Sequence, residues 1–481
     1  MQGFQMWIGG RRRDAESGQT LPVVNPATGE EIAQIPCGGP AEVDAAVEAA
    51  RNALPVWSEK SQAERSAIVN RIGVLLKENA EEFARLDALD HGTPINMARH
   101  LIDSAALGFE YNSQAGRALM GEMLPIRRTA LHYMQREPVG VCALIIPWNV
   151  PLAMIAAKMG AALTVGNTCV VKPPSIDSLV ALKLVDILEK VGLPPGTVNI
   201  VTGPGGSVGE ALATHPGVDL ISFTGSSETG QAIMAKAGRT TKRLIMELGG
   251  KNPFIVLADA DVKAAVQKAV FSTHVNAGQV CASPGRYYVH ESIHDEFIRE
   301  YVAAAGKVEV GDPLSEKTFM GPLVSAEHRD KVEGYIKTGI DEGATLVLGG
   351  ERPARPPLDR GYYVVPTAFT DVTLDMKIGR EEIFGPVACV MKFSSEEEVL
   401  ASANDNVYGL CASVWTRDVV KAINMANKLR AGTVYINDHL TISPDMPWGG
   451  FKESGFGKEN ALVGLQEYTQ LKLIALELMA G

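Results

Sequence analysis

Apolar side chains in the N-terminal part of the chain recur with the period of an α-helix. Residues 61–64 (Ser-Gln-Ala-Glu) form a capping-box pattern at the start of this helical region. Gly92 and Pro94 are expected to end it. The apolar residues that share one helical face are Ile68, Ile72, Leu75 and Leu76.

From about residue 138 the pattern changes to short apolar runs that alternate with helical stretches. One predicted helix begins at Pro151 and a second begins near Ser175. A third runs through Ala211, and a fourth extends from Ser226 to Ala237. Strands that alternate with helices indicate parallel pairing in a doubly wound α/β sheet. The predicted strands span 141–146, 168–171, 198–201, 218–223 and 244–247.

Polar residues and glycines cluster just beyond the ends of these predicted strands. In open α/β sheets, ligands bind beyond the carboxyl ends of the strands. The cluster therefore indicates a cofactor crevice at that edge of the sheet. The residues concerned are Asn149, Lys172, Gly203, Gly205, Gly225 and Ser226.

Composition narrows the class of protein. A chain of 481 residues exceeds one ordinary core, so two or three domains are expected. A net charge of −11 argues against nucleic acid or an anionic membrane as the main partner. The six cysteines are scattered and no signal peptide is evident, so reduced thiols and a cytoplasmic location are expected. Prolines, asparagines and a lysine interrupt the most apolar stretch, 139–171, which favours a buried strand–helix–strand unit over a membrane span.

A glycine-containing turn at 223–230 (Phe-Thr-Gly-Ser-Ser-Glu-Thr-Gly) ends one predicted strand and opens a helix. Gly225 would let the backbone approach an anion, with the helix amides pointing at a phosphate. A plain tight turn explains the segment equally well. The usual dinucleotide fingerprint is absent, since 203–209 misses its spacing by one residue.

Two further motifs point to other enzyme classes. Residues 205–209 match the elbow of serine hydrolases, but Ser207 lies six residues beyond Val201 and not at the tip of its strand. Residues 290–294 match the zinc motif H-E-x-x-H, but His290 is predicted to end a strand and Ser292 to cap the next helix. A serine hydrolase and a metalloprotease are therefore the less favoured interpretations.

Cys281 and Glu247 carry the candidate chemistry. Cys281 stands in a loop-like segment, where a deprotonated thiol is a plausible nucleophile. Glu247 stands at a predicted strand end before two glycines, which suits a general base that must approach and withdraw. On residue type alone, an inert buried cysteine and a glutamate at a β-bulge explain the two positions better.

Taken together, these segments resemble the aldehyde dehydrogenase superfamily. The matching blocks occur in the family's order and span nearly the whole chain. The resemblance implies an α/β fold with a Rossmann-type cofactor domain, an α/β catalytic domain and a small β oligomerisation element. The blocks are 147–151 (Pro-Trp-Asn-Val-Pro), 171–174 (Val-Lys-Pro-Pro), 223–226 (Phe-Thr-Gly-Ser), 247–250 (Glu-Leu-Gly-Gly), 278–281 (Gly-Gln-Val-Cys), 382–386 (Glu-Ile-Phe-Gly-Pro) and 447–455 (Pro-Trp-Gly-Gly-Phe-Lys-Glu-Ser-Gly).

The resemblance implies oxidation of an aldehyde to a free carboxylic acid with NAD or NADP, and no metal. Cys281 would be the nucleophile and Glu247 the base that activates the hydrolytic water. The Asn149 side chain and the Cys281 amide would form the oxyanion hole. Relatives that pass the acyl group to coenzyme A generally lack this glutamate, so its presence favours hydrolysis. Lys158 and Glu459 match family positions that help relay protons.

The resemblance also assigns the cofactor contacts. Lys172 would contact the adenosine ribose, Ser226 the pyrophosphate and Glu382 the nicotinamide ribose, with Phe384 packing nearby. Many NAD-preferring relatives carry a glutamate where this chain has Ser175, so dual use of NAD and NADP is expected, although Ser175 could also cap its helix. The other cofactor-binding residues implied are Ile146, Trp148, Gly205, Phe223, Gly225 and Leu248.

The segment 437–446 falls where the family shapes its substrate tunnel. It is similar to members that act on aminoaldehydes or betaine aldehyde, and Asp438 or Asp445 could face an ammonium group, although exposed loop acids are commoner. An aminoaldehyde substrate is therefore a hypothesis. A serine hydrolase using Ser207 and a catalytically silent structural relative are alternatives from other classes. The intact set of Asn149, Glu247 and Cys281 argues against a silent protein.

Three parts are expected in the domain organisation. The cofactor domain comprises 1–118 and 138–246, the catalytic domain 247–447, and the oligomerisation element 119–137 and 462–481. Predicted strands at 129–135 and 468–476 belong to the third part, and a tail strand pairing with another subunit would cover an exposed edge. The resemblance implies a homo-oligomer, either a dimer or a tetramer.

Overall fold

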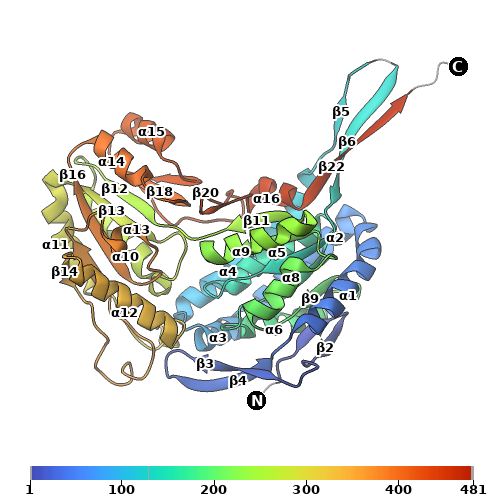
Figure 1. The fold of residues 1–481 in the computed structure, drawn as a ribbon, viewed down its shortest axis with the longest axis horizontal. Coiled ribbons are helices and arrows are strands. Elements are labelled where there is room, and N and C mark those ends of the chain that lie inside the picture. Colours follow the sequence, from blue (N-terminus) through green and yellow to red (C-terminus); the bar gives the residue numbers. More distant parts are fainter. Residues whose placement is uncertain (1–2, 128, 478–481) are drawn as a thin grey trace.

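Two lobes, each built on a large sheet, and a projecting arm make up the chain (Figure 1). The computed structural model describes residues 3–127 and 129–477. The larger sheet has a parallel centre with antiparallel strands at both edges. Its strands, in spatial order, are β2 (Arg11–Arg13), β1 (Met6–Ile8), β9 (Val198–Ile200), β8 (Thr168–Lys172), β7 (Val141–Ile145), β10 (Leu220–Thr224), β11 (Arg243–Glu247) and β21 (Gly455–Phe456).

The parallel centre of this sheet confirms the predicted doubly wound arrangement, and each of the five predicted strands is found within two residues of its expected bounds. Strands covered on both faces read as continuous apolar runs, because every side chain meets a helix layer. On β7, Val141 and Ala143 pack with one layer, while Cys142 and Leu144 pack with the other.

Helices cover both faces of the eight-stranded sheet. One layer contains α1 (Pro40–Ser58), α8 (Glu210–Thr214) and α9 (Ser227–Ala237). The other contains α2 (Gln62–Glu78), α3 (Ala80–Asp90), α4 (Ile95–Ala115), α5 (Pro151–Thr164), α6 (Leu179–Lys183) and α7 (Val185–Leu188). The predicted capping box opens α2, with the Ser61 side chain accepting from the Glu64 N–H and the Glu64 carboxylate accepting from the Ser61 N–H.

Two predicted helix boundaries are wrong. The helical region does not end at Gly92 and Pro94, because α4 starts directly after Pro94, where the missing proline N–H costs nothing. The helix expected near Ser175 begins only at Leu179, because Asp177 has a left-handed φ of 64° that a helix cannot contain.

The second lobe is built on a seven-stranded sheet, parallel except for β14. In spatial order its strands are β14 (Thr345–Leu348), β15 (Thr367–Thr370), β16 (Val387–Phe393), β13 (Pro284–His290), β12 (Asn252–Val256), β18 (Cys411–Trp415) and β19 (Thr433–Ile436). Helices α10 (Val262–His274) and α11 (His294–Ala305) cover one face. Helices α12 (Ala326–Asp341), α13 (Lys377–Arg380), α14 (Glu396–Asn404) and α15 (Val419–Lys428) cover the other.

Short elements join the lobes. Strands β3 (Thr20–Asn25) and β4 (Glu30–Pro36) form a hairpin, and β17 (Tyr408–Gly409) pairs with β20 (Phe451–Lys452). Helix α16 (Ala461–Glu467) precedes the arm. No helix in the described ranges has the length and apolar character needed to cross a membrane.

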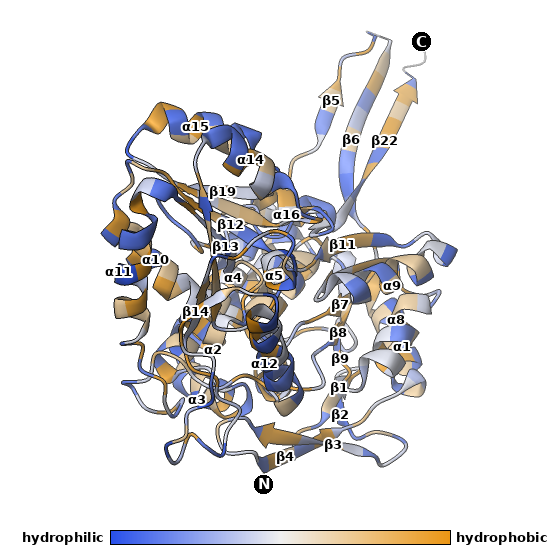
Figure 2. Ribbon diagram, turned by 60° about the vertical axis from the view of Figure 1, so that its left-hand side comes forward, coloured by the Kyte–Doolittle hydropathy of each residue, from blue (hydrophilic) through white to orange (hydrophobic). Residues whose placement is uncertain are grey.

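The arm is a three-stranded antiparallel sheet of β5 (Glu122–Leu124), β6 (Ala130–Pro138) and β22 (Thr469–Glu477), so both predicted strands are confirmed. It mixes hydrophobic and hydrophilic residues along its length (Figure 2). β22 pairs with β6 of its own chain over nine residues and forms the edge of the sheet. The exposed leucines Leu471, Leu473 and Leu476 lie on this edge strand. The dimer or tetramer stays a prediction.

Candidate active site

Cys281 lies in the loop between a short helical turn (Val275–Gly278) and β13, as expected. Asn276, Ala277 and Gly278 have φ values of 52°, 55° and 74°. Three left-handed residues in succession reverse the chain sharply, a conformation that is strained for the first two. Of the six cysteines, only Cys281 and Cys37 are not buried.

Side chains from the second lobe hold the backbone of this loop. Asn252 Nδ2 donates to the carbonyls of Cys281 and Ser283, each at 2.8 Å, and its Oδ1 accepts from the Cys411 N–H. His439 Nε2 lies 2.7 Å from the Ala282 carbonyl, so this nitrogen must carry the proton. Three consecutive carbonyls are therefore fixed. We did not predict either support from the sequence, although Asn252 stands five residues after Glu247.

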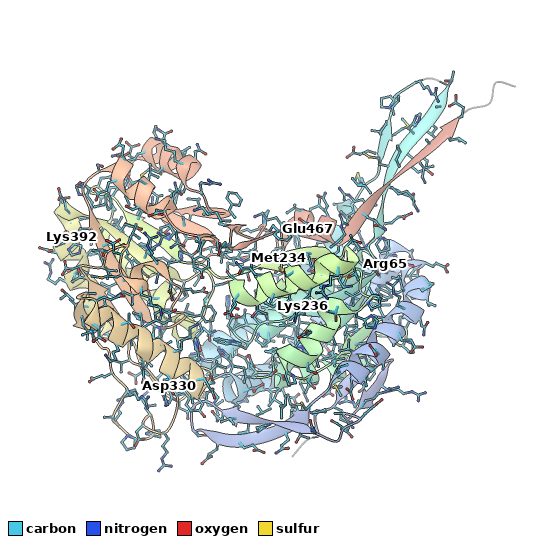
Figure 3. The ribbon with its side chains drawn as sticks, in the orientation of Figure 1. Arg65, Met234, Lys236, Asp330, Lys392 and Glu467 are labelled. Carbon is cyan, nitrogen blue, oxygen red and sulfur yellow. The ribbon has the colours of Figure 1, made fainter. Side chains whose placement is uncertain are left out.

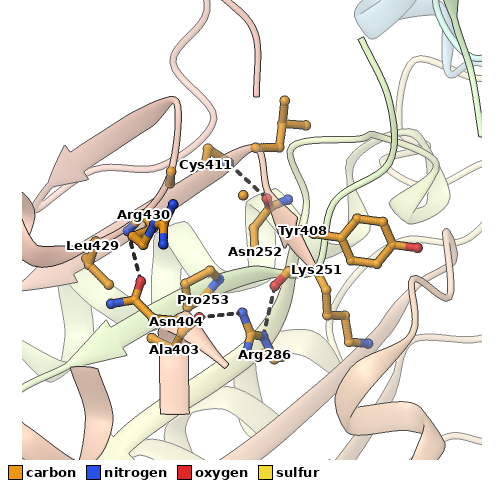
Figure 4. A pocket seen from close by; sticks show the side chains of 14 residues that line it. Lys251, Asn252, Pro253, Arg286, Ala403, Asn404, Tyr408, Cys411, Leu429 and Arg430 are labelled. Carbon is orange, nitrogen blue, oxygen red and sulfur yellow. Dashed lines mark hydrogen bonds between the residues drawn. The ribbon is translucent and has the colours of Figure 1, made fainter. Parts of the chain in front are cut away.

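Figure 4 shows the packing on the far side of Asn252. Arg286 is buried there and donates to the backbone carbonyls of Lys251, Ser402 and Ala403. The cavity between these side chains has a volume of about 10 Å³, which is at the lower limit for a single water. This region supports the loop and offers no ligand site.

Glu247 is the last residue of β11 and lies beside Cys281. Its Oε1 accepts from Trp448 Nε1 at 3.3 Å, and its Oε2 has no hydrogen-bond partner among the described residues. Burial, and then the charge of Glu459, raise the pKa of the Glu247 carboxyl to about 7. The Cys281 residue is partly exposed, but loss of solvent around its thiol, and then the neighbouring Glu247, raise the pKa of this thiol above its usual range. At neutral pH the thiol therefore keeps its proton, while the Glu247 carboxyl is divided between its protonated and ionised forms.

Asn149 follows β7 and reaches the Cys281 loop through a buried network of amides. Its Nδ2 donates to the Gln279 carbonyl at 2.9 Å, and its own carbonyl accepts from Asn276 Nδ2 at 2.9 Å. Gln279 is fixed in turn by Asn276 and Val324. In the part of the chain that the structure describes, no acceptor engages the second Asn149 amide hydrogen or the Cys281 backbone N–H. Two donors fixed in this way are able to stabilise an oxyanion.

Lys158 and Glu459, predicted to relay protons, form a buried ion pair. Lys158 Nζ also donates to Ser222 Oγ at 2.9 Å. Because Glu459 raises the pKa of Glu247, its charge acts directly on the candidate base.

A cavity of about 610 Å³, the cofactor crevice, lies at the carboxyl ends of the parallel strands. Lys236 of α9, labelled in Figure 3, is one of its lining residues. Burial lowers the pKa of Lys172 to about 8, and its Nζ donates to the Pro173 carbonyl. Ser226 caps α9 by accepting from the Thr229 N–H. Seven of the predicted cofactor residues line the crevice: Ile146, Trp148, Lys172, Gly205, Phe223, Gly225 and Ser226.

The other four predicted cofactor residues lie around this crevice without lining it. Ser175 Oγ donates to the Gly203 carbonyl at 3.0 Å, so the prediction that it caps a helix is wrong; Ser178 holds the position before α6. Leu248 is buried against Gly230 of α9. The remaining two, Glu382 and Phe384, belong to one loop of the second lobe.

Glu382 packs against the glycines that follow Glu247. Its Oε1 accepts from the Gly250 N–H at 3.0 Å, and burial raises the pKa of its carboxyl to about 7. A Cβ at Gly249 would lie 2.5 Å from Glu382 Oε2, so only glycine allows this approach. The two glycines therefore link the candidate base to the Glu382 loop.

Four rings connect the loops that carry Asn149 and Glu382. Trp148 meets Phe384 edge-on at 5.2 Å and His328 at 5.1 Å, and it stacks on His91 at 5.9 Å. His328 Nε2 donates to the Phe384 carbonyl at 2.8 Å, and Phe384 has a left-handed φ of 57°. Burial lowers the pKa of His328 to about 4, so the ring is neutral at pH 7. Sequence reasoning missed both histidines, because nothing in their local sequence marks them.

The two competing motifs are not assembled into sites. Ser207 lies in a helical turn (Gly205–Gly209), beyond the end of β9. His290 ends β13 and His294 opens α11, so His290 lies outside the helix as predicted. The predicted cap Ser292 is wrong, because it lies within a short 3₁₀ turn and Ile293 occupies the position before α11.

A second cavity, of about 220 Å³, reaches Cys281 and Asn149, and we call it the entry cavity. One face of α4 lines it at Met97, Leu101, Ser104 and Gly108, the spacing of a single helical stripe. Asp438 and Asp445 do not line it. Asp438 pairs with Lys268 at 2.6 Å, and Asp445 accepts from Ser443 Oγ.

Comparison with known sequences bears on this geometry. The pattern of the aldehyde dehydrogenase family matches residues 13–474. The chain is 44% identical over 471 residues to betaine aldehyde dehydrogenase of Bacillus subtilis, covering 97% of this chain and 96% of that protein. It is 43% identical over 473 residues to hydroxyisobutyraldehyde dehydrogenase of Mycolicibacterium austroafricanum, covering 98% and 94%.

Solved structures agree in fold. Betaine aldehyde dehydrogenase of Staphylococcus aureus in complex with NAD+ superposes with a TM-score of 0.98 at 37% identity, covering 100% of this chain and 96% of that one. A point mutant of the same enzyme, with NAD+ and a cysteine modified by β-mercaptoethanol, also gives 0.98 at 37% identity, covering 100% and 98%. The expected α/β fold is confirmed.

Proposed function

The chain belongs to the aldehyde dehydrogenase family, and from that membership we propose that it oxidises an aldehyde to the free carboxylic acid through a covalent intermediate on Cys281. It is an NAD(P)-dependent aldehyde dehydrogenase. One observation carries the proposal: the Cys281 thiol lies beside the buried carboxyl of Glu247, and one oxygen of this carboxyl has no hydrogen-bond partner in the part of the chain that the structure describes.

The cofactor crevice fits a dinucleotide. Lys172 would hold the adenosine ribose, and the N-terminus of α9 with Ser226 the pyrophosphate, since free amides at a helix start bind anions. Glu382 and Phe384 would hold the nicotinamide end. When bound, the cofactor supplies the acceptor for a hydride. Ser175 brings no carboxylate toward the adenosine ribose, which supports use of both NAD and NADP.

The first step is attack of the Cys281 sulfur on the aldehyde carbonyl carbon. The thiol proton passes to Glu247, whose pKa near 7 lets the carboxylate accept it. The carbonyl oxygen becomes an oxyanion that accepts from the Asn149 amide and the Cys281 backbone N–H. Loss of a hydride from this thiohemiacetal leaves an acyl group bound to Cys281 as a thioester.

Hydrolysis of the thioester completes the reaction. The buried pair of Glu459 and Lys158 would carry the thiol proton away from Glu247 before hydrolysis begins. Once the thiol proton has left Glu247, the ionised carboxylate takes a proton from a water molecule as the water oxygen attacks the acyl carbon. The C–S bond then breaks to release the carboxylic acid and the Cys281 thiolate, which takes this proton back from Glu247. In sum, one aldehyde, one oxidised cofactor and one water give one acid, one reduced cofactor and one proton.

A cofactor-reduction assay tests the proposal. Purified protein, given aliphatic, aromatic and hydroxylated aldehydes with NAD or NADP, is expected to reduce both cofactors. One equivalent of free acid should form for each cofactor reduced, without added coenzyme A. Acid formation that requires coenzyme A, or no reduction with any aldehyde in the panel, would contradict it.

His328 is expected to act on cofactor binding by positioning Phe384. Removing its hydrogen bond in His328→Ala frees the strained Phe384 loop, so the KM for NAD should rise about tenfold while kcat changes less than about threefold. His328→Gln keeps a donor of similar reach and should stay close to wild type. Lys337→Ala, on the exposed side of α12, is the matched control. A fall in kcat as large as the rise in KM, together with a lower unfolding temperature, would indicate a purely structural role.

A further inference from the structure

The entry cavity has an apolar wall where a substrate chain would lie. Its walls come from α4, from the start of α5, from the Cys281 loop and from the segment 440–444. At about 220 Å³ it exceeds the roughly 150 Å³ of a cavity that holds benzene, so a branched or aromatic group fits. The apolar side chains that carry the argument are Met97, Leu101, Met154, Phe271, Leu440 and Ile442.

Among the described residues that line this cavity, no carboxylate lacks a cationic partner. Glu459 lines it, but its carboxylate is paired with the buried Lys158 ammonium. The Asp438 carboxylate is held by Lys268 and accepts from Thr441, and it lies outside the lining. Asp445, also outside, accepts from Ser443. A cationic substrate would therefore lose its water without gaining a counter-ion.

Aromatic faces do not replace the missing charge. Recognition of a quaternary ammonium by rings needs several ring faces around the cation. Among the described residues that line the cavity, only Phe271 and Trp448 are aromatic, and the Trp448 indole N–H is directed at Glu247. Among the polar residues of the lining, Ser104 carries a hydroxyl without charge, and His100 is an exposed residue.

We propose that the entry cavity selects an uncharged aldehyde with an apolar chain or ring and discriminates against a cationic one. The inference rests on the proposed function and gives it a substrate class. It differs from the aminoaldehyde hypothesis, since the two acids on which that hypothesis depends are engaged by protein side chains.

A pair of isosteric aldehydes tests charge alone. Betaine aldehyde and 3,3-dimethylbutanal have the same shape, with a quaternary nitrogen in one and a carbon in the other. Steady-state kcat/KM is measured for both with saturating NAD, after correction for the hydrated fraction of each aldehyde by proton NMR. We expect the neutral compound to be preferred by at least about 100-fold.

Each other outcome overturns a different statement. Equal or greater kcat/KM for betaine aldehyde overturns the inference and leaves the dehydrogenase reaction standing. Turnover of glyceraldehyde but of neither isostere overturns the apolar assignment alone. No cofactor reduction with any aldehyde overturns the proposed function and this inference with it.

A new charge in the wall provides an independent test. Leu101→Glu places a carboxylate on the α4 face of the cavity and should lower the preference for the neutral isostere at least tenfold. Leu107→Glu, on the exposed side of the same helix, is the matched control and should leave the preference unchanged. Thermal unfolding of both variants checks that they fold. An unchanged preference in a folded Leu101→Glu variant would contradict the assignment of this wall to the substrate.

Discussion

Aldehyde oxidation by the Cys281→Ala variant is expected to fall by on the order of 10⁴-fold or more, because no other group can form the thioester. The expected loss lies in the chemical step, since the alanine side chain leaves the cofactor crevice untouched. Cofactor binding, followed by quenching of protein fluorescence, should therefore remain within about twofold of wild type.

Cys37→Ala is the matched control for this experiment. Cys37 and Cys281 are the two cysteines that are not buried, so both are open to alkylation. Iodoacetamide should inactivate wild type and the Cys37→Ala variant at the same rate, with mass added to the peptide that contains Cys281. Inactivation that depends on Cys37, or residual turnover by Cys281→Ala above about 1% of wild type, would show that Cys281 is not the nucleophile.

The fold was predictable where local pattern and burial agree. The strands from β7 to β11 are apolar on both faces because two helix layers cover them, and their continuous runs stand out in the sequence. The helix expected near Ser175 shows the limit of this reasoning. Helical periodicity cannot reveal that Asp177 adopts a left-handed conformation, which delays the start of α6 to Leu179.

The candidate site was predictable only through its ordered motifs. Residue type alone favoured an inert thiol at Cys281, and the order of seven blocks reversed that interpretation. Supports such as Asn252, His439 and His328 were not predictable. Asn252 reaches Cys281 across 29 positions and His439 reaches Ala282 across 157, so each contact exists only once the second lobe has folded. A polar residue that acts through such a contact has no local signature.

The Glu247→Gln variant is expected to separate the two halves of the reaction. Without the base, hydrolysis of the thioester should slow by about 10²- to 10³-fold. The first turnover should slow less than hydrolysis does. Cys281 and the oxyanion donors remain, but the thiol must give its proton to water in place of Glu247. Rapid mixing with aldehyde and NAD should show a burst close to one reduced cofactor per site, followed by a slow steady state. The surface variant Glu333→Gln should show wild-type kinetics.

The pH dependence of wild type should reveal the same carboxyl. Burial and the charge of Glu459 raise the pKa of Glu247 from its ordinary 4.5 to about 7, and only the ionised form can act as a base. The rate of thioester hydrolysis should therefore rise with pH through about 7 and level off above it. Glu247→Gln should lose this rise. A rise that persists in the variant would assign the titration to another group.

The Glu247→Gln substitution should raise the free energy of unfolding at pH 8 while it lowers the rate of thioester hydrolysis. As pH rises above 4.5, the unfolded chain releases the proton of Glu247, whereas the folded protein keeps it up to about pH 7. The stability that this carboxyl contributes is therefore fully present below pH 4.5 and is lost as pH rises through about 7. At pH 8 wild type buries a charge that the glutamine variant lacks, so Glu247→Gln should be more stable by up to about 3 kcal/mol. Slower hydrolysis together with a higher unfolding temperature at pH 8 cannot arise from damage to the fold. A variant that is slower and also less stable at pH 8 would remove the support for Glu247 as a base whose pKa is raised by burial.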